Sequence, residues 1–421
     1  MTKRDDIAFL ARRVAWGLAP GQLDKLETVG TSAYIDALID PDGAGIAAEP
    51  SPWAGFEYTH DQELRQEQAL ETLDRWTTHL VKTDRPYENA MAWFWHDHFA
   101  VSFQVVKYLP ILIDHLDLIR DQGFGDFREL IRSVTTDSAM LVFLDGATST
   151  GQAPNENYGR ELLELYTIGI GNYTEDDVAA ASVALTGWVV RRQLLGEAQF
   201  VPDRHDSTPQ LLLGEMVSDV DSVVDAACSH SACAGFIAAK VARFFLGNPS
   251  DSVVGRITDR FSASGLDMAV LARDVLDAGL AGESTLQIVA PVPWLVGALK
   301  ATTAQIEPRI RIGLLRLMGQ VPGSPPNVGG FPGASTWLAS SATAARFSAA
   351  NVVARATPDD AAAIRLAADG EWDGLADLFL RPQGFSEATL AALRDLPTNV
   401  STRRGEGALA LSLASPDLLV A

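Results

Sequence analysis

Two parts of the sequence gather the side chains that most often bind metals or transfer protons. Residues 93–99, WFWHDHF, set two histidines and an aspartate in an aromatic stretch. Residues 154–188 hold three asparagines, six carboxylates and one arginine, and the pair His205-Asp206 follows them. A packed core does not need so many polar side chains, because each one must be satisfied by a hydrogen bond or a counter-charge. These segments are therefore predicted to form a functional site.

The chemistry that this set favours is metal-assisted or acid–base catalysis. Carboxylates and imidazoles together suit iron, manganese or zinc, and helices can hold such ligands around an ion. The predicted metal ligands are His96, His98, Glu161, Glu164, His205 and Asp206. The predicted catalytic residues are Asn157, Arg160 and Glu161, and the predicted substrate-binding residues are Trp95, Asn155 and Trp188. On a regular helix His96 and His98 point about 200° apart, so one of the two is expected to be the ligand.

The same residues also have structural interpretations. Hydrogen bonds in an aromatic core can satisfy a buried histidine, and Arg160 can pair with Glu164 one helical turn later. The pair His205-Asp206 can lie on an exposed loop.

Two hypotheses follow. The first is a metal-dependent enzyme that activates water for hydrolysis, or oxygen for oxidation, of a small polar or anionic substrate. The second is a noncatalytic binding or assembly protein whose polar residues form a buried network.

The elements that must position these residues are mostly helices. Apolar residues recur at three- and four-residue spacings, which indicates amphipathic helices. The predicted helices cover residues 23–38, 61–81, 88–103, 109–121, 127–134, 155–168, 176–185, 236–246, 252–262, 268–278, 286–301 and 309–318, with short helices in 337–418. Asn155 fits a helix N-cap, and Thr174 fits a capping box with Asp177.

Two interruptions of the helical pattern are expected. Short runs at 188–190, 199–201 and 210–213 predict a small hairpin that carries a polar loop, within residues 188–215. Residues 319–333 hold five glycines and four prolines, which exclude a helix or a central strand. A long loop of this kind can provide a surface on which a protein partner docks. The predicted fold is mainly α, as one large multi-helical domain over residues 1–421.

Composition narrows the partners and the compartment. The chain carries 54 acidic and 33 basic side chains, for a formal net charge of −21, which repels nucleic acid and anionic lipid headgroups. The sequence contains no nucleotide-binding or flavin-binding motif. The sequence shows neither a signal core nor an apolar run long enough for a bilayer, so a cytoplasmic protein without a transmembrane segment is expected. Cys228 and Cys233 are close enough for a local disulfide, whereas a zinc site would need further ligands.

Six segments together resemble the bacterial family known as domain of unknown function 1800. They are FLARRVAWGLAPGQLDKL (9–26), FWHDHF (94–99), PNENYGRELLELYTIGIGNYTEDDV (154–178), LTGW (185–188), HD (205–206) and GQVPGSPPNVGGFPGASTWL (319–338). The chain departs from the usual family pattern at Asp97, where asparagine is common, at Tyr166, where histidine or phenylalanine is common, and at Phe331, where tryptophan is common. Many members look exported, and they are often encoded beside a second, sulfatase-like family. The resemblance implies a shared fold and site, and it implies no reaction.

Overall fold

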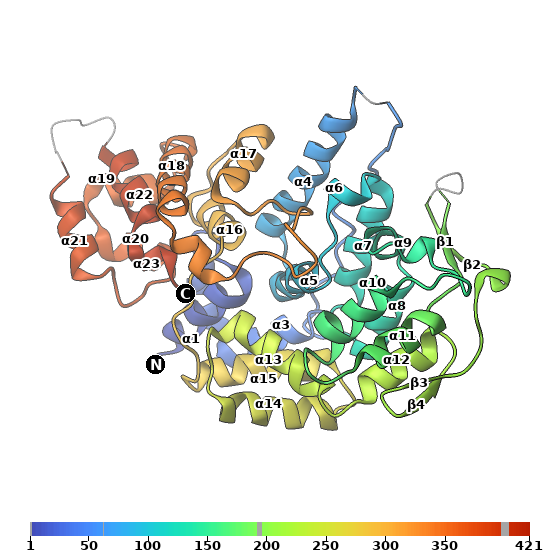
Figure 1. Cartoon of the computed structure of the whole chain (residues 1–421). Coiled ribbons are helices and arrows are strands. Elements are labelled where there is room, and N and C mark those ends of the chain that lie inside the picture. Colours follow the sequence, from blue (N-terminus) through green and yellow to red (C-terminus); the bar gives the residue numbers. More distant parts are fainter. Residues whose placement is uncertain (1, 62, 192–195, 397–403) are drawn as a thin grey trace.

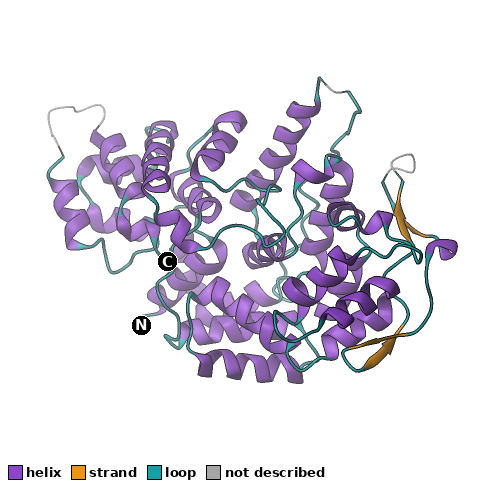
Figure 2. Ribbon diagram, viewed as in Figure 1, coloured by secondary structure: helices purple, strands orange, loops and turns teal. Residues whose placement is uncertain are grey.

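A computed structural model describes residues 2–61, 63–191, 196–396 and 404–421 of the chain. Nearly all regular structure in these residues is helical, and the strands form two small antiparallel hairpins at one edge (Figure 2). The prediction of a mainly α fold with a small β element is therefore confirmed. The prediction of a single domain stays a prediction.

The described residues form 23 α-helices that follow one another along the chain. They are α1 (Lys3–Leu10), α2 (Gln22–Val29), α3 (Thr31–Ile39), α4 (Arg65–Lys82), α5 (Pro86–His98), α6 (Phe103–Val106), α7 (Leu109–Gln122), α8 (Phe127–Thr135), α9 (Ser138–Phe143), α10 (Glu156–Glu161), α11 (Glu175–Ala184), α12 (Val220–Ser229), α13 (Cys233–Leu246), α14 (Asp251–Ala263), α15 (Met268–Leu280), α16 (Pro291–Thr302), α17 (Pro308–Met318), α18 (Ser340–Ala356), α19 (Ala362–Asp369), α20 (Trp372–Leu378), α21 (Glu387–Arg394), α22 (Arg404–Ala414) and α23 (Pro416–Leu419). Two π-helices, η1 (Ala11–Ala15) and η3 (Leu162–Thr167), continue α1 and α10, and 3-10 turns lie at η2 (Gly146–Thr148), η5 (Pro202–Arg204) and η6 (Ala334–Leu338).

The helices are arranged around α5, which lies near the middle of the molecule (Figure 1). The C-terminal helices α18–α23 pack together at one end, and the two hairpins lie at the opposite end. The π-helix η1 contacts α5 and α13, so the N-terminal segment reaches the centre of the fold. Segments far apart in the sequence therefore meet around the C-terminal half of α5.

Several helix boundaries differ from those predicted, because the backbone breaks there. The helix predicted over 23–38 is divided into α2 and α3 at Gly30, whose φ of 100° is incompatible with a helix. The helix predicted to reach Phe103 ends at His98, and the short α6 follows. The helix predicted over 155–168 begins as α10 and continues as η3. A π-helix holds an extra residue in its turn, so it rotates the side chains that follow.

The β structure exceeds the single hairpin predicted for residues 188–215. β1 (Trp188–Val190) pairs with β2 (Ala198–Phe200), as expected. The run at 210–213 instead forms a second hairpin, in which β3 (Gln210–Leu212) pairs with β4 (Glu215–Val217). Leu213 and Gly214 close this hairpin with φ of 53° and 89°, the signs of a tight two-residue turn. Leucine-glycine is a weak turn signal, so the sequence did not indicate β4. Residues 192–195 of the predicted hairpin lie outside the described residues.

The helix α5 is buried on nearly every side. Pro86 occupies its first turn, where the missing N–H is not needed. Trp95 has no exposed surface, stacks on Phe99 with ring centroids 5.2 Å apart, and donates its indole N–H to the oxygen of Gly123 at 2.8 Å. Each large apolar side chain buried in this way contributes about 1.5–3 kcal/mol. The helix is thus a rigid support for the polar residues at its C-terminal end.

The helices α12 and α13 bear on two predictions. No single described helix is long and apolar enough to cross a membrane, although α12 and α13, bent by 74°, meet the length and composition requirement together. Cys228 near the end of α12 and Cys233 at the start of α13 are buried free thiols, so the local disulfide that their spacing allows is not formed. A hydrogen bond to Cys228, together with burial, raises the pKa of the Cys233 thiol.

Candidate functional site

Three consecutive residues at the end of α5 tie two other segments to the core. The main-chain N–H of Gly323 donates to His96 Nε2 at 3.1 Å, and that of Phe331 donates to Asp97 Oδ1 at 2.6 Å. His98 Nε2 lies 3.1 Å from the main-chain oxygen of Tyr166 in η3. The FWHDHF motif therefore fixes the loop of residues 319–333, here called the 319–333 loop, and the end of η3.

His96 acts as a neutral hydrogen-bond acceptor. It has no exposed surface, and the rings of Trp76, Trp93 and Phe331 surround it at centroid distances of 5.0, 5.4 and 5.9 Å. Burial, and then the charge of His115, lowers the pKa of His96 to about 3. Because Nε2 accepts from an amide, the single proton of the neutral ring belongs on Nδ1. Nδ1 has no partner among the described residues, so the structural interpretation of a hydrogen-bonded core histidine accounts for only one of the two ring nitrogens.

The carbonyl groups at the end of η3 receive two buried donors. Lys240 Nζ of α13 donates to the oxygen of Leu165 at 3.1 Å, beside the contact between His98 and Tyr166. Burial, and then the charge of Lys240, holds the pKa of His98 well below its ordinary value. His98 therefore donates from Nε2, and its Nδ1 keeps a lone pair that no described group engages. A π-helix frees carbonyl groups in this way and often marks a functional site.

Asp97 and Lys240 influence each other's charge without a direct ion pair, and the pKa of each is shifted toward neutral pH. Burial raises the pKa of Asp97 to about 6, against the opposing effects of the Phe331 N–H and the charge of Lys240. Burial lowers the pKa of Lys240 to about 8, against the opposing charge of Asp97. Groups that titrate near the working pH are suited to proton transfer.

Asp97 lines a pocket of about 200 Å³, here called the Asp97 pocket. Its walls are Arg12, Arg13, Trp16, Trp93, Asp97, Phe244, residues 287–290, Pro293, Gln320, residues 331–334, Trp337 and Ala421. Pockets for drug-sized ligands hold about 300–1,000 Å³, so this one suits a smaller molecule. Gly330 brings the 319–333 loop against Asp97, because its φ is 89° and a Cβ there would overlap Asp97 Oδ1.

Two arginines of η1 give this pocket positive charge. Arg13 uses both of its terminal nitrogens, since it donates to Gln287 Oε1 at 2.6 Å and to the main-chain oxygens of Phe245, Thr285 and Ala421, and its Nε has no partner among the described residues. Arg12 donates to the main-chain oxygen of Leu380, and its Nε has no partner among the described residues. Burial lowers the pKa of Arg12 to about 9 and that of Arg13 to about 10, which leaves both charged at neutral pH.

The polar hairpin predicted over residues 154–188 forms, with α10 packed against α11, while η3 contacts α12 and α13. The side chain of Asn155 caps α10 by accepting from the N–H of Asn157 at 2.9 Å. Thr174 and Asp177 form the predicted capping box at the start of α11. Asn157 is exposed, and its amide lies 3.4 Å from Asp145 Oδ2. These contacts define where the two helices begin.

The ion pair between Arg160 and Glu164 that their spacing allows does not form. Arg160 instead pairs across to Glu175 of α11 at 2.7 Å, because the two helices pack side by side. Glu164 accepts a hydrogen bond from the hydroxyl of Tyr173. Burial, and then the charge of Glu164, raises the pKa of Glu161. Exposed pairs such as that of Arg160 contribute about 0–1 kcal/mol, so this hairpin surface is weakly constrained.

His205 and Asp206 anchor the loop that follows β2. The two ring nitrogens of His205 lie 3.0 Å from the main-chain oxygens of Thr186 and Ser218. Asp206 Oδ1 accepts from the N–H of Thr208 at 2.9 Å, and hydrogen bonds from the side chain and then the main chain of Thr208 lower the pKa of Asp206. Both residues therefore hold neighbouring backbone in place.

The predicted site residues are brought together only in part. Asn155 and Trp188 line one crevice of about 10 Å³, which is room for about one water molecule. Trp95 is sealed in the core, and His96 and His98 face different partners. Within residues 2–61, 63–191, 196–396 and 404–421, no three His, Cys, Asp or Glu side chains are placed to hold a metal ion. Metal binding therefore stays a prediction. The six predicted ligands do not form one metal centre in the described part of the chain.

Sequence reasoning missed four residues that the structure places at or beside the Asp97 pocket. They are Arg12, Arg13, Asp97 and Lys240. A signal was present for three of them, because Asp97 lies inside WFWHDHF and the arginine pair lies inside FLARRVAWGLAP. Lys240 carried no local signal, since it lies in an otherwise ordinary amphipathic helix.

Three of the segments that resemble the family of unknown function 1800 also line the Asp97 pocket, namely those at 9–26, 94–99 and 319–338. No curated protein and no solved structure matches the chain. A family model described as protein of unknown function (DUF1800) matches residues 9–420. The match covers nearly the whole chain, and the chain therefore belongs to this family of unknown function.

Proposed function

We propose that this chain is an enzyme that acts on a small anionic substrate by acid–base catalysis, with Asp97 as the group that exchanges a proton with the substrate. The observation that carries the proposal is the placement of Asp97 in a pocket that also holds the guanidinium groups of Arg12 and Arg13. A carboxyl group with a pKa of about 6 is populated in both protonation states near neutral pH. General acid–base catalysis is most effective under that condition.

The surrounding contacts suit this role. The N–H of Phe331 fixes Asp97 Oδ1, and the described residues provide no donor to Oδ2, which leaves that oxygen available to a ligand. Lys240 supplies a nearby positive charge that limits how far burial raises the pKa of Asp97. Arg12 retains unused N–H groups that can bind an anion.

The proposal concerns this chain rather than every member of its family. Asparagine, which is common at this position in the family, can accept the same hydrogen bond from Phe331. It cannot exchange a proton near neutral pH. The substitution Asp97→Asn therefore separates the two roles of Asp97, because it keeps the anchor and removes the acid.

The test is a screen of hydrolytic activity on a panel of p-nitrophenyl esters, phosphates and glycosides, followed by a pH profile of the best substrate. We expect an apparent pKa of about 6 in kcat/KM and a loss of about 100- to 10,000-fold in Asp97→Asn. The matched control is Asp259→Asn, which changes an exposed aspartate of α14. Activity in Asp97→Asn within a few-fold of wild type would reject the acid–base role.

The metal-dependent form of the enzyme, predicted from the sequence, is supported by fewer observations than the acid–base form. Three buried histidines, His96, His98 and His115, each have one ring nitrogen without a partner among the described residues, at Nδ1, Nδ1 and Nε2. Asp137 Oδ2 lies 3.0 Å from His115 Nδ1, an orientation that is typical of metal-binding histidines. Elemental analysis of protein purified without an affinity metal column, before and after chelation, tests this form. Near-stoichiometric iron, manganese or zinc would support it, and empty protein after reconstitution would reject it.

A further inference from the structure

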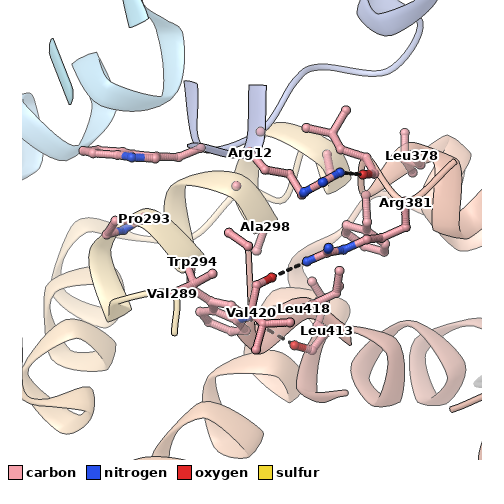
Figure 3. A pocket seen from close by; sticks show the side chains of 17 residues that line it. Arg12, Val289, Pro293, Trp294, Ala298, Leu378, Arg381, Leu413, Leu418 and Val420 are labelled. Atoms are coloured by element: carbon pink, nitrogen blue, oxygen red, sulfur yellow. Dashed lines mark hydrogen bonds between the residues drawn. The ribbon is translucent and has the colours of Figure 1, made fainter. Parts of the chain in front are cut away.

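Two arginines face one small pocket without an acidic partner. Arg12 of η1 and Arg381, which follows α20, line a pocket of about 70 Å³ that adjoins the Asp97 pocket (Figure 3). Each donates to a single main-chain oxygen, Arg12 to Leu380 and Arg381 to Val420. The Nε of each is buried and has no partner among the described residues. We call this space the arginine pocket.

Asp5 and Asp417 act on Arg12 and Arg381 only from beyond ion-pair distance, so neither arginine has a close counter-charge in this chain. Its formal net charge is −21, and fourteen other arginine or histidine side chains pair with Asp or Glu, yet no described Asp or Glu forms an ion pair with Arg12 or Arg381. Burial, and then the charge of Arg381, lowers the pKa of Arg12. Guanidinium groups stay charged, so their mutual repulsion remains unless an anion lies between them.

The rest of the arginine pocket is apolar. Trp294, Leu378, Leu413 and Leu418 contribute to its wall, and the indole N–H of Trp294 is already used on the oxygen of Leu413 at 3.2 Å. A ligand there meets cations on one side and hydrocarbon on the other. This combination favours an anion that carries an apolar group over a fully hydrated inorganic anion.

We propose that the arginine pocket binds a small organic anion, a carboxylate with a short apolar tail, whose carboxylate lies between the guanidinium groups of Arg12 and Arg381. The planar carboxylate matches the fork of N–H groups that a guanidinium presents. The two adjoining pockets hold about 70 and 200 Å³, below the usual size for drug-like ligands, which sets the tail at a few carbons. The inference rests on the proposed function, since Arg12 lines both pockets and the anion is the charged end of the substrate.

The test is titration calorimetry of the full chain in a carboxylate-free buffer of low salt. The probes are hexanoate, its neutral counterpart hexanamide, and inorganic phosphate. Wild-type protein is expected to bind hexanoate at least tenfold more tightly than hexanamide or phosphate. No hexanoate binding up to about 10 mM, or equal affinity for hexanamide, overturns the proposal. A preference for phosphate overturns the choice of a carboxylate with a tail. These measurements on wild-type protein do not depend on any variant folding.

Two variants locate the bound anion. Arg381→Met removes the charge and keeps an apolar side chain, and it is expected to weaken hexanoate binding at least tenfold. Arg316→Met, at an exposed position of α17, is the matched control and leaves the affinity unchanged. Equal hexanoate affinity in folded Arg381→Met overturns the proposal and leaves Arg12 and Arg381 as anchors of the backbone.

Asp97→Asn distinguishes this inference from the proposed function. Hexanoate binding that persists in Asp97→Asn, together with undiminished turnover of the best substrate, rejects the acid–base role and keeps the anion site. Failure of hexanoate to bind wild-type protein, together with loss of turnover in Asp97→Asn, rejects the anion site and keeps the acid–base role.

Discussion

Asp97→Asn should make the folded protein more stable at neutral and alkaline pH and have little effect in acid. The folded protein holds the pKa of Asp97 at about 6, above the ordinary value of 3.8. Between these two values the folded chain binds more protons than the unfolded chain, so the free energy of unfolding of wild type falls as the pH rises. Asparagine keeps the acceptor for the Phe331 N–H and carries no charge to bury.

The size of the effect follows from the shift. A displacement of about two pKa units corresponds to about 3 kcal/mol at 1.36 kcal/mol per unit. Asp97→Asn should therefore gain about 3 kcal/mol over wild type above about pH 7, and the gain should vanish below about pH 4. For 421 residues, at an unfolding entropy of about 2.1 cal/mol/K per residue, this equals about 3 °C in Tm.

The assay is the thermal unfolding midpoint from tryptophan fluorescence, measured for both proteins at closely spaced pH values from 4 to 8. Asp259→Asn serves as the matched control and should stay within about 0.5 kcal/mol of wild type at every pH. If the stability difference between Asp97→Asn and wild type is the same at pH 4 and pH 8, the reasoning is refuted. That result would mean that the folded protein does not raise the pKa of Asp97.

Three further outcomes are expected. Gly330→Ala should destabilise the protein by about 1–3 kcal/mol in urea unfolding, because a methyl group at positive φ overlaps Asp97, whereas Gly333→Ala meets no atom within 4 Å and should be nearly neutral. Tyr158→Phe should cost about 0.5–1.5 kcal/mol in the same assay by removing a buried 2.8 Å hydrogen bond to a threonine hydroxyl, and no change would contradict that assignment. Glu161→Gln should leave the metal content of purified protein unchanged in elemental analysis, because the predicted ligands do not converge; loss of bound metal would restore that site.

Local features of the fold were predictable from the sequence because their causes are local. The caps at Asn155 and Thr174 depend on residues within one helical turn, and both form as predicted. Helix ends that depend on distant contacts were less predictable. The end of α5 at His98 accompanies the docking of the 319–333 loop onto His96 and Asp97, more than 200 residues away in sequence.

The candidate site was harder to predict than the fold, because residue type does not tell whether a polar group faces backbone or ligand. His96 and His205 look like ligands in the sequence, yet each bonds to main-chain groups. The Asp97 pocket combines residues from Arg12 to Ala421, and Lys240 acts on Asp97 from a helix without any motif. Only the packing of these segments makes the combination visible.

The π-helix η3 restricts insertions and deletions within residues 162–167 of this chain. Removing one residue from within 162–167 would allow an ordinary α-helix, which is the more stable local geometry. The same deletion would turn the carbonyl groups of Leu165 and Tyr166 by about 100° and carry them away from Lys240 and His98. Substitutions on the exposed face of this segment should therefore be accepted more readily than any insertion or deletion, so its residue count is under stronger constraint than its surface composition.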